Sequence, residues 1–172
     1  EIVNAKAKEV TEGFLYNRPY EARMQNFAEP NIPEPLNYNK VLLKILSHEN
    51  MASREPIFEQ YDKQIQGRIH AETGLADSGV MAPFNSEKYP EEIRNVGIAL
   101  STDQNPRHGL IDPYWGGVNA VVEAMRNVAA VGATPHALSD CLCFGNPEKP
   151  HQMWEFVESV RGVADACNAI TL

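Results

Sequence analysis

The amino-acid sequence predicts an α+β fold, and three observations lead to this prediction. Short apolar runs at 79–84 and 96–102, bounded by glycine, proline and polar residues, are typical of strands. Two longer stretches, 116–133 and 147–169, carry apolar residues at the spacing of an α-helix. The apolar run 135–143, which joins these helices, predicts a further strand. The length of 172 residues suits one such domain.

Local signals place the other elements of this domain. The segment 37–50 has apolar residues at helical spacing after Asn37, a favourable N-cap, and a second short helix is expected at 54–62. The sequence NSEKYPEE, between the first two strands, is typical of a hairpin turn. Gly132 stands where a helix stop belongs. The last three residues, 170–172, are expected to begin another strand.

The first 37 residues differ from the rest of the chain. They contain four prolines at positions 19, 30, 33 and 35, a spacing that excludes a regular helix or a central strand. We therefore predict an extended arm or linker at 1–37 and the α+β domain at 38–172. A loose tail and an arm packed on the domain both remain open.

Composition and charge exclude several classes of function. The formal net charge of −8 disfavours general binding to nucleic-acid backbones, which calls for a basic face. No apolar run approaches the length of a membrane span, and the polar start of the chain lacks the pattern of a signal peptide. We therefore expect a cytoplasmic protein that binds neither nucleic acid nor a membrane.

The cysteines are expected to be reduced, buried thiols. Cys141, Cys143 and Cys167 sit among apolar residues, and no second Cys/His pair stands at zinc-finger spacing. A metal site or a redox site at Cys141 and Cys143 is therefore the less favoured interpretation.

Glu123 and Asn127 form the first candidate site. They stand four residues apart on the predicted helix 116–133, so they share a face. Because their neighbours are apolar nearly all round, we expect this helix to be largely buried. A carboxylate there needs a partner, and oxygen ligands of this kind suit Mg²⁺. A surface ion pair of Glu123 with Arg126 or with a distant lysine is the alternative, and spacing alone favours it.

Other acidic residues flank the predicted strands. Asp140 lies within 135–143, where a backbone hydrogen bond or a ligand contact would explain it. The segment 101–117 joins a strand to a helix and is a candidate ligand loop or an Asx-built turn. Its polar residues include Asp103, Asn105 and Arg107. Asp77 precedes the strand at 79–84 and is either a metal ligand or a turn residue.

Several motifs occur together and in order: an Asp-Pro-Tyr turn, a Glu-xxx-Asn helix, and the loop Asp-Cys-Leu-x-Phe-Gly-Asn-Pro. Over about residues 40–172 the chain resembles the phosphoribosylformylglycinamidine synthase family, within the aminoimidazole ribonucleotide synthetase-like superfamily. The resemblance implies the N-terminal domain of the second half of the synthetase, with a mixed β-sheet and two long helices packed on one face. The Glu-Ser-His-Asn-His motif of this family is absent from this sequence.

The resemblance also implies an activity and its site. The family uses ATP and glutamine-derived ammonia to convert formylglycinamide ribonucleotide to the amidine, in purine biosynthesis. By position, Asp140 matches a nucleotide-contacting Asp, and three residues match magnesium ligands: Asp77, Glu123 and Asn127. The implied cofactors are ATP and Mg²⁺.

The implied partners are a homologous first-half synthetase domain and a glutaminase domain or subunit, and we expect the fragment to be inactive alone. A non-catalytic pairing module, including a homodimer of this chain, is the alternative. A thiamine-phosphate or selenophosphate-type kinase of the same superfamily is disfavoured by the loop after Asp140.

Overall fold

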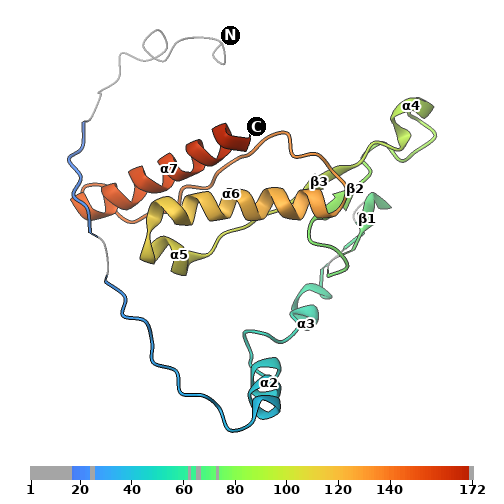
Figure 1. The fold of residues 1–172 in the computed structure, drawn as a ribbon. Helices are drawn as coiled ribbons and strands as arrows, with labels where there is room; N and C mark the ends of the chain where they lie inside the picture. Colours follow the sequence, from blue (N-terminus) through green and yellow to red (C-terminus); the bar gives the residue numbers. More distant parts are fainter. Residues whose placement is uncertain (1–16, 24–25, 62, 65–66, 73, 171–172) are drawn as a thin grey trace.

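The computed structural model describes residues 17–23, 26–61, 63–64, 67–72 and 74–170. Helices and a small sheet follow one another along the chain, in agreement with the predicted α+β class. Figure 1 shows two long helices side by side, a small sheet near the end of one of them, and a separate helical segment connected to the sheet. No helix in the described part of the chain is long and apolar enough to cross a membrane.

The sheet has three antiparallel strands in the order β1 (Ile69–Ala71), β2 (Gly79–Met81) and β3 (Ile98–Leu100). The register of β2 and β3 pairs Gly79 with Leu100 and Met81 with Ile98. These two strands confirm the predictions at 79–84 and 96–102, although both are shorter. Their connection contains a short helix, α4 (Glu91–Arg94), so it is longer than a simple hairpin turn. Strand β1 was not predicted.

The predicted strand at 135–143 is not formed. Among the residues that the structure describes, this segment has no strand partner, and its backbone hydrogen bond runs from the Cys143 amide to the Cys141 carbonyl at 3.0 Å. An apolar sequence pattern favours extended backbone, but a strand also needs a neighbour that accepts and donates its hydrogen bonds. Because the segment adds no parallel strand, the sheet is antiparallel over the described residues rather than mixed.

The two long helices are α6 (Pro113–Ala130) and α7 (Pro150–Ile170). The side chain of Asp112 accepts a hydrogen bond from the Trp115 amide at 3.1 Å, and Pro113 occupies the first turn. This cap starts α6 three residues before the predicted boundary. Gly132 follows the end of α6 with φ of +83°, a conformation that glycine adopts without strain, which confirms the predicted stop. Ile170 ends α7, so no strand begins there, and 171–172 lie outside the described residues.

Helices α6 and α7 pack on each other at two glycines. A Cβ atom added to Gly117 would lie 2.5 Å from the Ser159 carbonyl oxygen, and one added to Gly162 would overlap the Tyr114 carbonyl oxygen. The absence of side chains at these positions lets the helix backbones approach closely. The buried apolar residues of the described chain, Val121 and Ala166, belong to these same helices.

The sheet lies beyond this helix pair and makes no comparably extensive contact with it (Figure 1). The expected packing of both helices on one face of the sheet is therefore not seen. A cavity of about 220 Å³ separates the sheet from the end of α6, with Val80 and Ala99 on one side and Val131 and Ala133 on the other. The short strands present too small a face to cover two long helices.

The N-terminal segment contains two short helices, α2 (Tyr38–Leu46) and α3 (Glu55–Phe58). The Asn37 side chain accepts a hydrogen bond from the Lys40 amide at 3.1 Å, which confirms the predicted cap. Every residue of α2 is exposed, including its apolar side chains. The apolar positions of α2 are Val41, Leu42, Leu43, Ile45 and Leu46.

The chain exposes much apolar surface. Its accessible area is 14432 Å², whereas a compact monomer of this mass would expose about 8400 Å². Large apolar side chains on α2, at the start of α6 and in the segment 134–149 contribute to this excess. The elements described are therefore formed without a closed hydrophobic core around them.

Candidate functional site

A polar cluster joins the end of the sheet to α6. The Asn127 side-chain amide, Nδ2, donates a hydrogen bond to Asp103 Oδ1 at 2.9 Å, and the Ser101 hydroxyl donates to Asp103 Oδ2. Strand β3 ends at Leu100, so it delivers Ser101 and Asp103 to the side of the helix. All three side chains are half-buried. We call Ser101, Asp103 and Asn127 the Asp103 cluster.

The Asp103 cluster joins two parts of the sequence-predicted site. Asn127 was expected to bind magnesium and Asp103 to lie in a ligand loop. The bond to Asp103 uses the amide nitrogen of Asn127 and not its carbonyl oxygen, which is the atom able to ligate a hard cation. Each carboxylate oxygen of Asp103 accepts one hydrogen bond.

Glu123 lies one helical turn before Asn127 and is exposed. The expectation that α6 is largely buried is wrong, because only Pro113, Gly117 and Val121 are buried on it. The neighbours of Glu123 along the helix, Val122 and Ala124, are half-buried. An exposed carboxylate is solvated by water, so burial does not demand a partner for Glu123. The expected alternative, an ion pair with Arg126, is not among the ion pairs of the described residues.

The segment 101–117 contains a helix that was not predicted, α5 (Pro106–Ile111). The Asn105 side chain accepts a hydrogen bond from the Arg107 amide at 3.0 Å, so Asn105 caps this helix. The Arg107 side chain is exposed. The sequence Asn-Pro is a cap followed by proline in the first turn, a signal that could have revealed α5.

Asp77 and Asp140 are exposed and lie on different elements. Asp77 belongs to the turn between β1 and β2, whereas Asp140 belongs to the extended segment that follows α6. The carboxylate of Asp140 contributes to a raised pKa at the neighbouring Cys141 thiol, where the hydrogen bond with Cys143 is the largest cause.

Of the residues singled out in the sequence, Asp103 and Asn127 are therefore in direct contact. Over the residues that the structure describes, no group of three His, Cys, Asp or Glu side chains could hold a metal ion. Glu123, Asn127 and Asp140 line neither the cavity beside the sheet nor the cavity between the segment 134–149 and α7. The roles assigned to these residues remain predictions.

The expectation of buried cysteines is wrong for Cys141 and Cys143, which are exposed, while Cys167 is half-buried. The Cys141 and Cys143 sulfur atoms lie 3.4 Å apart and share a hydrogen bond. Residues two apart in an extended chain share a face, and here no second sheet covers that face. The spacing of the two cysteines in the sequence therefore indicates that their side chains share a face.

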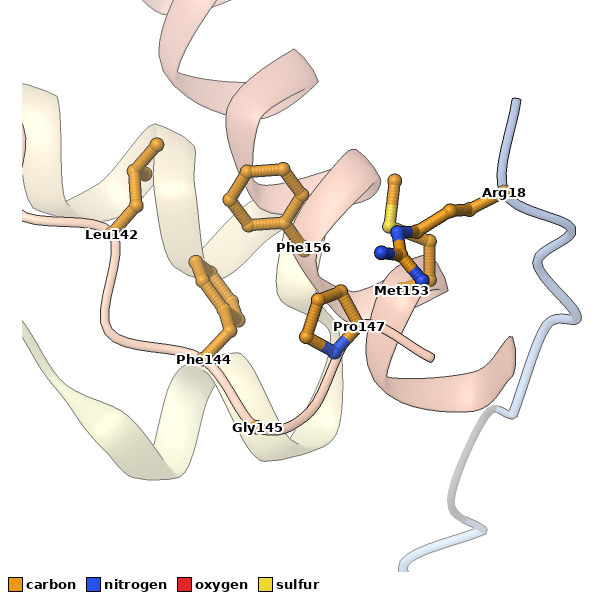
Figure 2. Close-up of a pocket in the computed structure, with 7 residues that line it drawn as sticks. All are labelled: Arg18, Leu142, Phe144, Gly145, Pro147, Met153 and Phe156. Atoms are coloured by element: carbon orange, nitrogen blue, oxygen red, sulfur yellow. The ribbon is translucent and has the colours of Figure 1, made fainter. Parts of the chain in front are cut away.

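A second cavity, of about 380 Å³, lies between the segment 134–149 and α7. Figure 2 shows Leu142 and Phe144 from the segment facing Met153 and Phe156 from α7, with Arg18 at the rim. The rings of Phe144 and Phe156 meet edge to face, with centroids 5.2 Å apart. This cavity was not predicted, because it depends on the path of the chain between the two helices.

Part of the predicted N-terminal arm contacts this region. The Glu21 amide donates a hydrogen bond to the Pro150 carbonyl at 3.2 Å, and Arg18 lies 3.9 Å from Glu148. Residues 17–23 form no helix or strand, and neither do 26–36. The described start of the arm therefore lies along the beginning of α7.

Several known proteins have sequences similar to this chain. The phosphoribosylformylglycinamidine synthase subunit PurL of Methanothrix thermoacetophila is 50% identical over 172 residues, which are 100% of this chain and 22% of that protein. The subunit PurL of Methanocaldococcus jannaschii is 46% identical over 135 residues, 78% of this chain and 17% of that protein. That of Deinococcus radiodurans is 42% identical over 139 residues, 81% of this chain and 18% of that protein. The chain thus spans about a fifth of the length of these relatives.

A family description also matches the region that holds most of the candidate site. Residues 77–172 match the family described as AIR synthase related protein, N-terminal domain. The match begins at Asp77 and includes β2, β3, α6 and α7, so it covers more than half of the chain. Residues 77–172 match the N-terminal domain of AIR synthase related proteins, and this chain therefore belongs to that family.

Proposed function

We propose that this chain is part of a phosphoribosylformylglycinamidine synthase. The observation that carries the proposal is the 50% identity to a PurL subunit over all 172 residues. The parent enzyme would be an ATP-dependent carbon–nitrogen ligase of purine biosynthesis, located in the cytoplasm. It would convert formylglycinamide ribonucleotide to the amidine with ammonia taken from glutamine. The chain spans 22% of that relative, so we expect it to be inactive alone.

The proposed site lies on one side of α6. Glu123 and Asn127 would hold Mg²⁺ together with Asp77, and Asp140 would contact the nucleotide. Support comes from the helix register, which places Glu123 and Asn127 one turn apart, and from Asp103 beside Asn127. Asp103 would orient Asn127 by accepting a hydrogen bond from its amide group, which leaves the Asn127 carbonyl oxygen for the ion. Asn105 and Arg107 would border the site from α5.

The residues present fit a magnesium ion in the type of their donor atoms. Mg²⁺ is usually held by one or two carboxylates and by phosphate oxygens, and it keeps several waters. Three full protein ligands at one point are therefore not required. When bound, the ion would neutralise phosphate charge during phosphoryl transfer. The contribution of this chain would be to hold the ion and the nucleotide in place.

The exposed apolar surface supports a role for partners. The excess of accessible area over that of a compact monomer is the kind of surface that a neighbouring domain covers. We propose that a homologous synthetase domain pairs with the sheet, and that the glutaminase belongs to the same assembly. In that setting 135–143 would join the sheet as a further strand, which would make it mixed and bring it against the helices.

An exchange of segments tests the proposal. In the Methanothrix thermoacetophila subunit, the part that matches this chain is replaced by residues 1–172, and the unaltered subunit serves as control. With the glutaminase, ATP and formylglycinamide ribonucleotide, the hybrid is expected to form the amidine and release phosphate, whereas the chain alone is not. A hybrid that elutes as the native subunit does, yet forms no amidine, would contradict the proposal.

A second candidate, a non-catalytic pairing module, is favoured by the same exposed apolar surface. It predicts that the chain alone forms a homodimer whose assembly does not depend on nucleotide. Sedimentation measurements over a range of concentrations test this alternative. The two candidates separate in the hybrid: a pairing module tolerates Glu123→Ala and Asp140→Ala without loss of amidine formation, whereas a nucleotide site does not.

A further inference from the structure

The geometry of the segment after α6 points to an oxidisable site directly after Asp140. We propose that Cys141 and Cys143 form a dithiol that closes to an intramolecular disulfide by exchange with small disulfides of the glutathione class. Their sulfur atoms lie 3.4 Å apart, and both residues are exposed. The inference concerns this chain's own thiols and does not depend on the proposed function.

The backbone holds the two thiols together. The Cys143 amide donates a hydrogen bond to the Cys141 carbonyl at 3.0 Å, which closes a three-residue γ-turn around Leu142. Two side chains that flank such a turn project to the same side. A disulfide requires a sulfur–sulfur distance of about 2.05 Å, so a small rotation of the side chains brings the sulfurs into bonding range.

The intervening residue anchors the turn on its other side. Leu142 lines the cavity against α7, and Phe144 packs edge to face on Phe156 (Figure 2). Cys141 and Cys143 alternate with these two residues, do not line the cavity and are exposed, so a small disulfide can reach them. In the described part of this chain the segment between α6 and α7 has no strand partners, so closing the bond in the chain by itself would break no sheet hydrogen bond there.

Closure follows from two exchange steps. The Cys143 thiolate attacks one sulfur of glutathione disulfide, and glutathione leaves as a thiolate. The Cys141 thiolate then attacks the Cys143 sulfur of this mixed disulfide and releases the second glutathione. The two cysteines together lose two protons and two electrons, and one glutathione disulfide becomes two molecules of glutathione. The same products form when Cys141 makes the first attack, because both thiols are exposed.

Cys167 provides an internal control. It lies on α7 and is half-buried, and it has no neighbouring thiol among the described contacts. Under the same treatment it can form a mixed disulfide with glutathione but cannot resolve it within the chain. The three cysteines therefore differ in the product that they give.

The test exposes the reduced chain to glutathione disulfide, quenches with acid and alkylates the remaining thiols. Intact mass and peptide mapping then identify the products. The peptide that contains Cys141 and Cys143 is expected to lose the mass of two hydrogens and take up neither alkyl group nor glutathione. Cys167→Ser is expected to behave in the same way, whereas Cys141→Ser and Cys143→Ser retain glutathione on the remaining thiol.

A denatured control separates geometry from mere proximity in sequence. In the folded chain the ratio of closed disulfide to mixed disulfide is expected to be at least about tenfold higher than in concentrated guanidinium chloride, because folding positions the sulfurs. An equal ratio in both states would overturn the proposal. Stable glutathione adducts on both Cys141 and Cys143, or disulfides to Cys167 or a second chain instead, would also overturn it.

Discussion

The Asn127 side-chain amide donates a hydrogen bond to the Asp103 carboxylate at 2.9 Å, and this bond ties α6 to the residues that follow β3. It is a contact between residues 24 positions apart in a chain with little buried surface. Asn127→Ala is expected to lower the free energy of unfolding by about 1 kcal/mol, the usual net contribution of such a bond. Chemical denaturation of both proteins measures this difference.

A double-mutant cycle tests the pairing itself. Asp103→Ala should cost a similar amount, and the double variant should cost less than the two single changes combined, because both remove one interaction. Strictly additive effects would show that the two side chains do not interact in solution. Glu123→Ala, on the exposed side of the same helix, serves as control and should leave the stability nearly unchanged.

The contact between α6 and α7 depends on glycine at the point of closest approach. Gly162→Ala places a Cβ atom on the Tyr114 carbonyl oxygen, so the helices must separate. We expect a loss of about 1–3 kcal/mol in the free energy of unfolding, as for other overpacked sites. Thermal and chemical unfolding of purified variants provide the measurement.

Gly109→Ala is the matched control for this change. A Cβ atom at Gly109 meets nothing within 4 Å, and this residue also lies in a helix, α5. Alanine favours helix over glycine by up to about 1 kcal/mol, so this variant should be as stable as the wild type or more so. If both variants were equally stable, the close packing of α6 on α7 would be contradicted.

The hydrogen bond of the Tyr114 hydroxyl group should make the stability of the chain depend on pH in the alkaline range. Its hydroxyl group donates to Asp165 Oδ2 at 3.1 Å, and this hydrogen bond is the main reason why the Tyr114 pKa is raised above 10.0. Since the folded pKa lies above the unfolded one, the stabilisation is complete below about pH 10 and is lost as pH rises through the folded pKa. The stability difference between wild type and Tyr114→Phe should therefore shrink in this range.

The tyrosinate absorbance checks the same bond directly. Asp165→Asn removes the negative charge of the acceptor, so the Tyr114 pKa should move toward its ordinary value. The titration of Tyr114 is obtained as the difference between each protein and its Tyr114→Phe counterpart. An unchanged titration curve in Asp165→Asn would show that Asp165 does not control this hydroxyl group.

The thiol pair adds a prediction for alkylation. The hydrogen bond with Cys143 and the neighbouring Asp140 charge raise the pKa of Cys141, so this thiol should be alkylated slowly near neutral pH and faster as pH rises. Cys143→Ser weakens the hydrogen bond that is the main cause of the raised pKa, so it should increase the rate of alkylation at Cys141. The rate is followed by mass spectrometry of the peptide. A lower rate in Cys143→Ser would contradict this assignment.

Local signals in the sequence predicted several elements well. The caps at Asn37 and the stop at Gly132 depend on residues within one turn of the helix, so a pattern reveals them. Strands β2 and β3 were recognisable by their apolar runs. The Asn-Pro start of α5 carries an equally local signal.

Features that depend on distant parts of the chain were not predicted. The segment 135–143 has the composition of a strand, but no neighbour pairs with it. The contact between Asn127 and Asp103 depends on how β3 meets α6, which neither segment specifies alone. The exposure of Glu123 and of the two neighbouring cysteines follows from surfaces that remain uncovered in this chain. Tertiary context decided each of these outcomes.

The central claim is that Glu123, Asn127 and Asp140 serve one magnesium–nucleotide site in the assembled enzyme. Calorimetric titration of the hybrid subunit with ATP, with and without Mg²⁺, tests it most directly, and Glu91→Ala on the exposed helix α4 is the control. We predict magnesium-dependent binding that weakens about tenfold or more in Glu123→Ala, Asn127→Ala and Asp140→Ala, as expected when one charged or ion-ligating contact is lost. Equal affinity in the hybrid and in these three variants would contradict the claim.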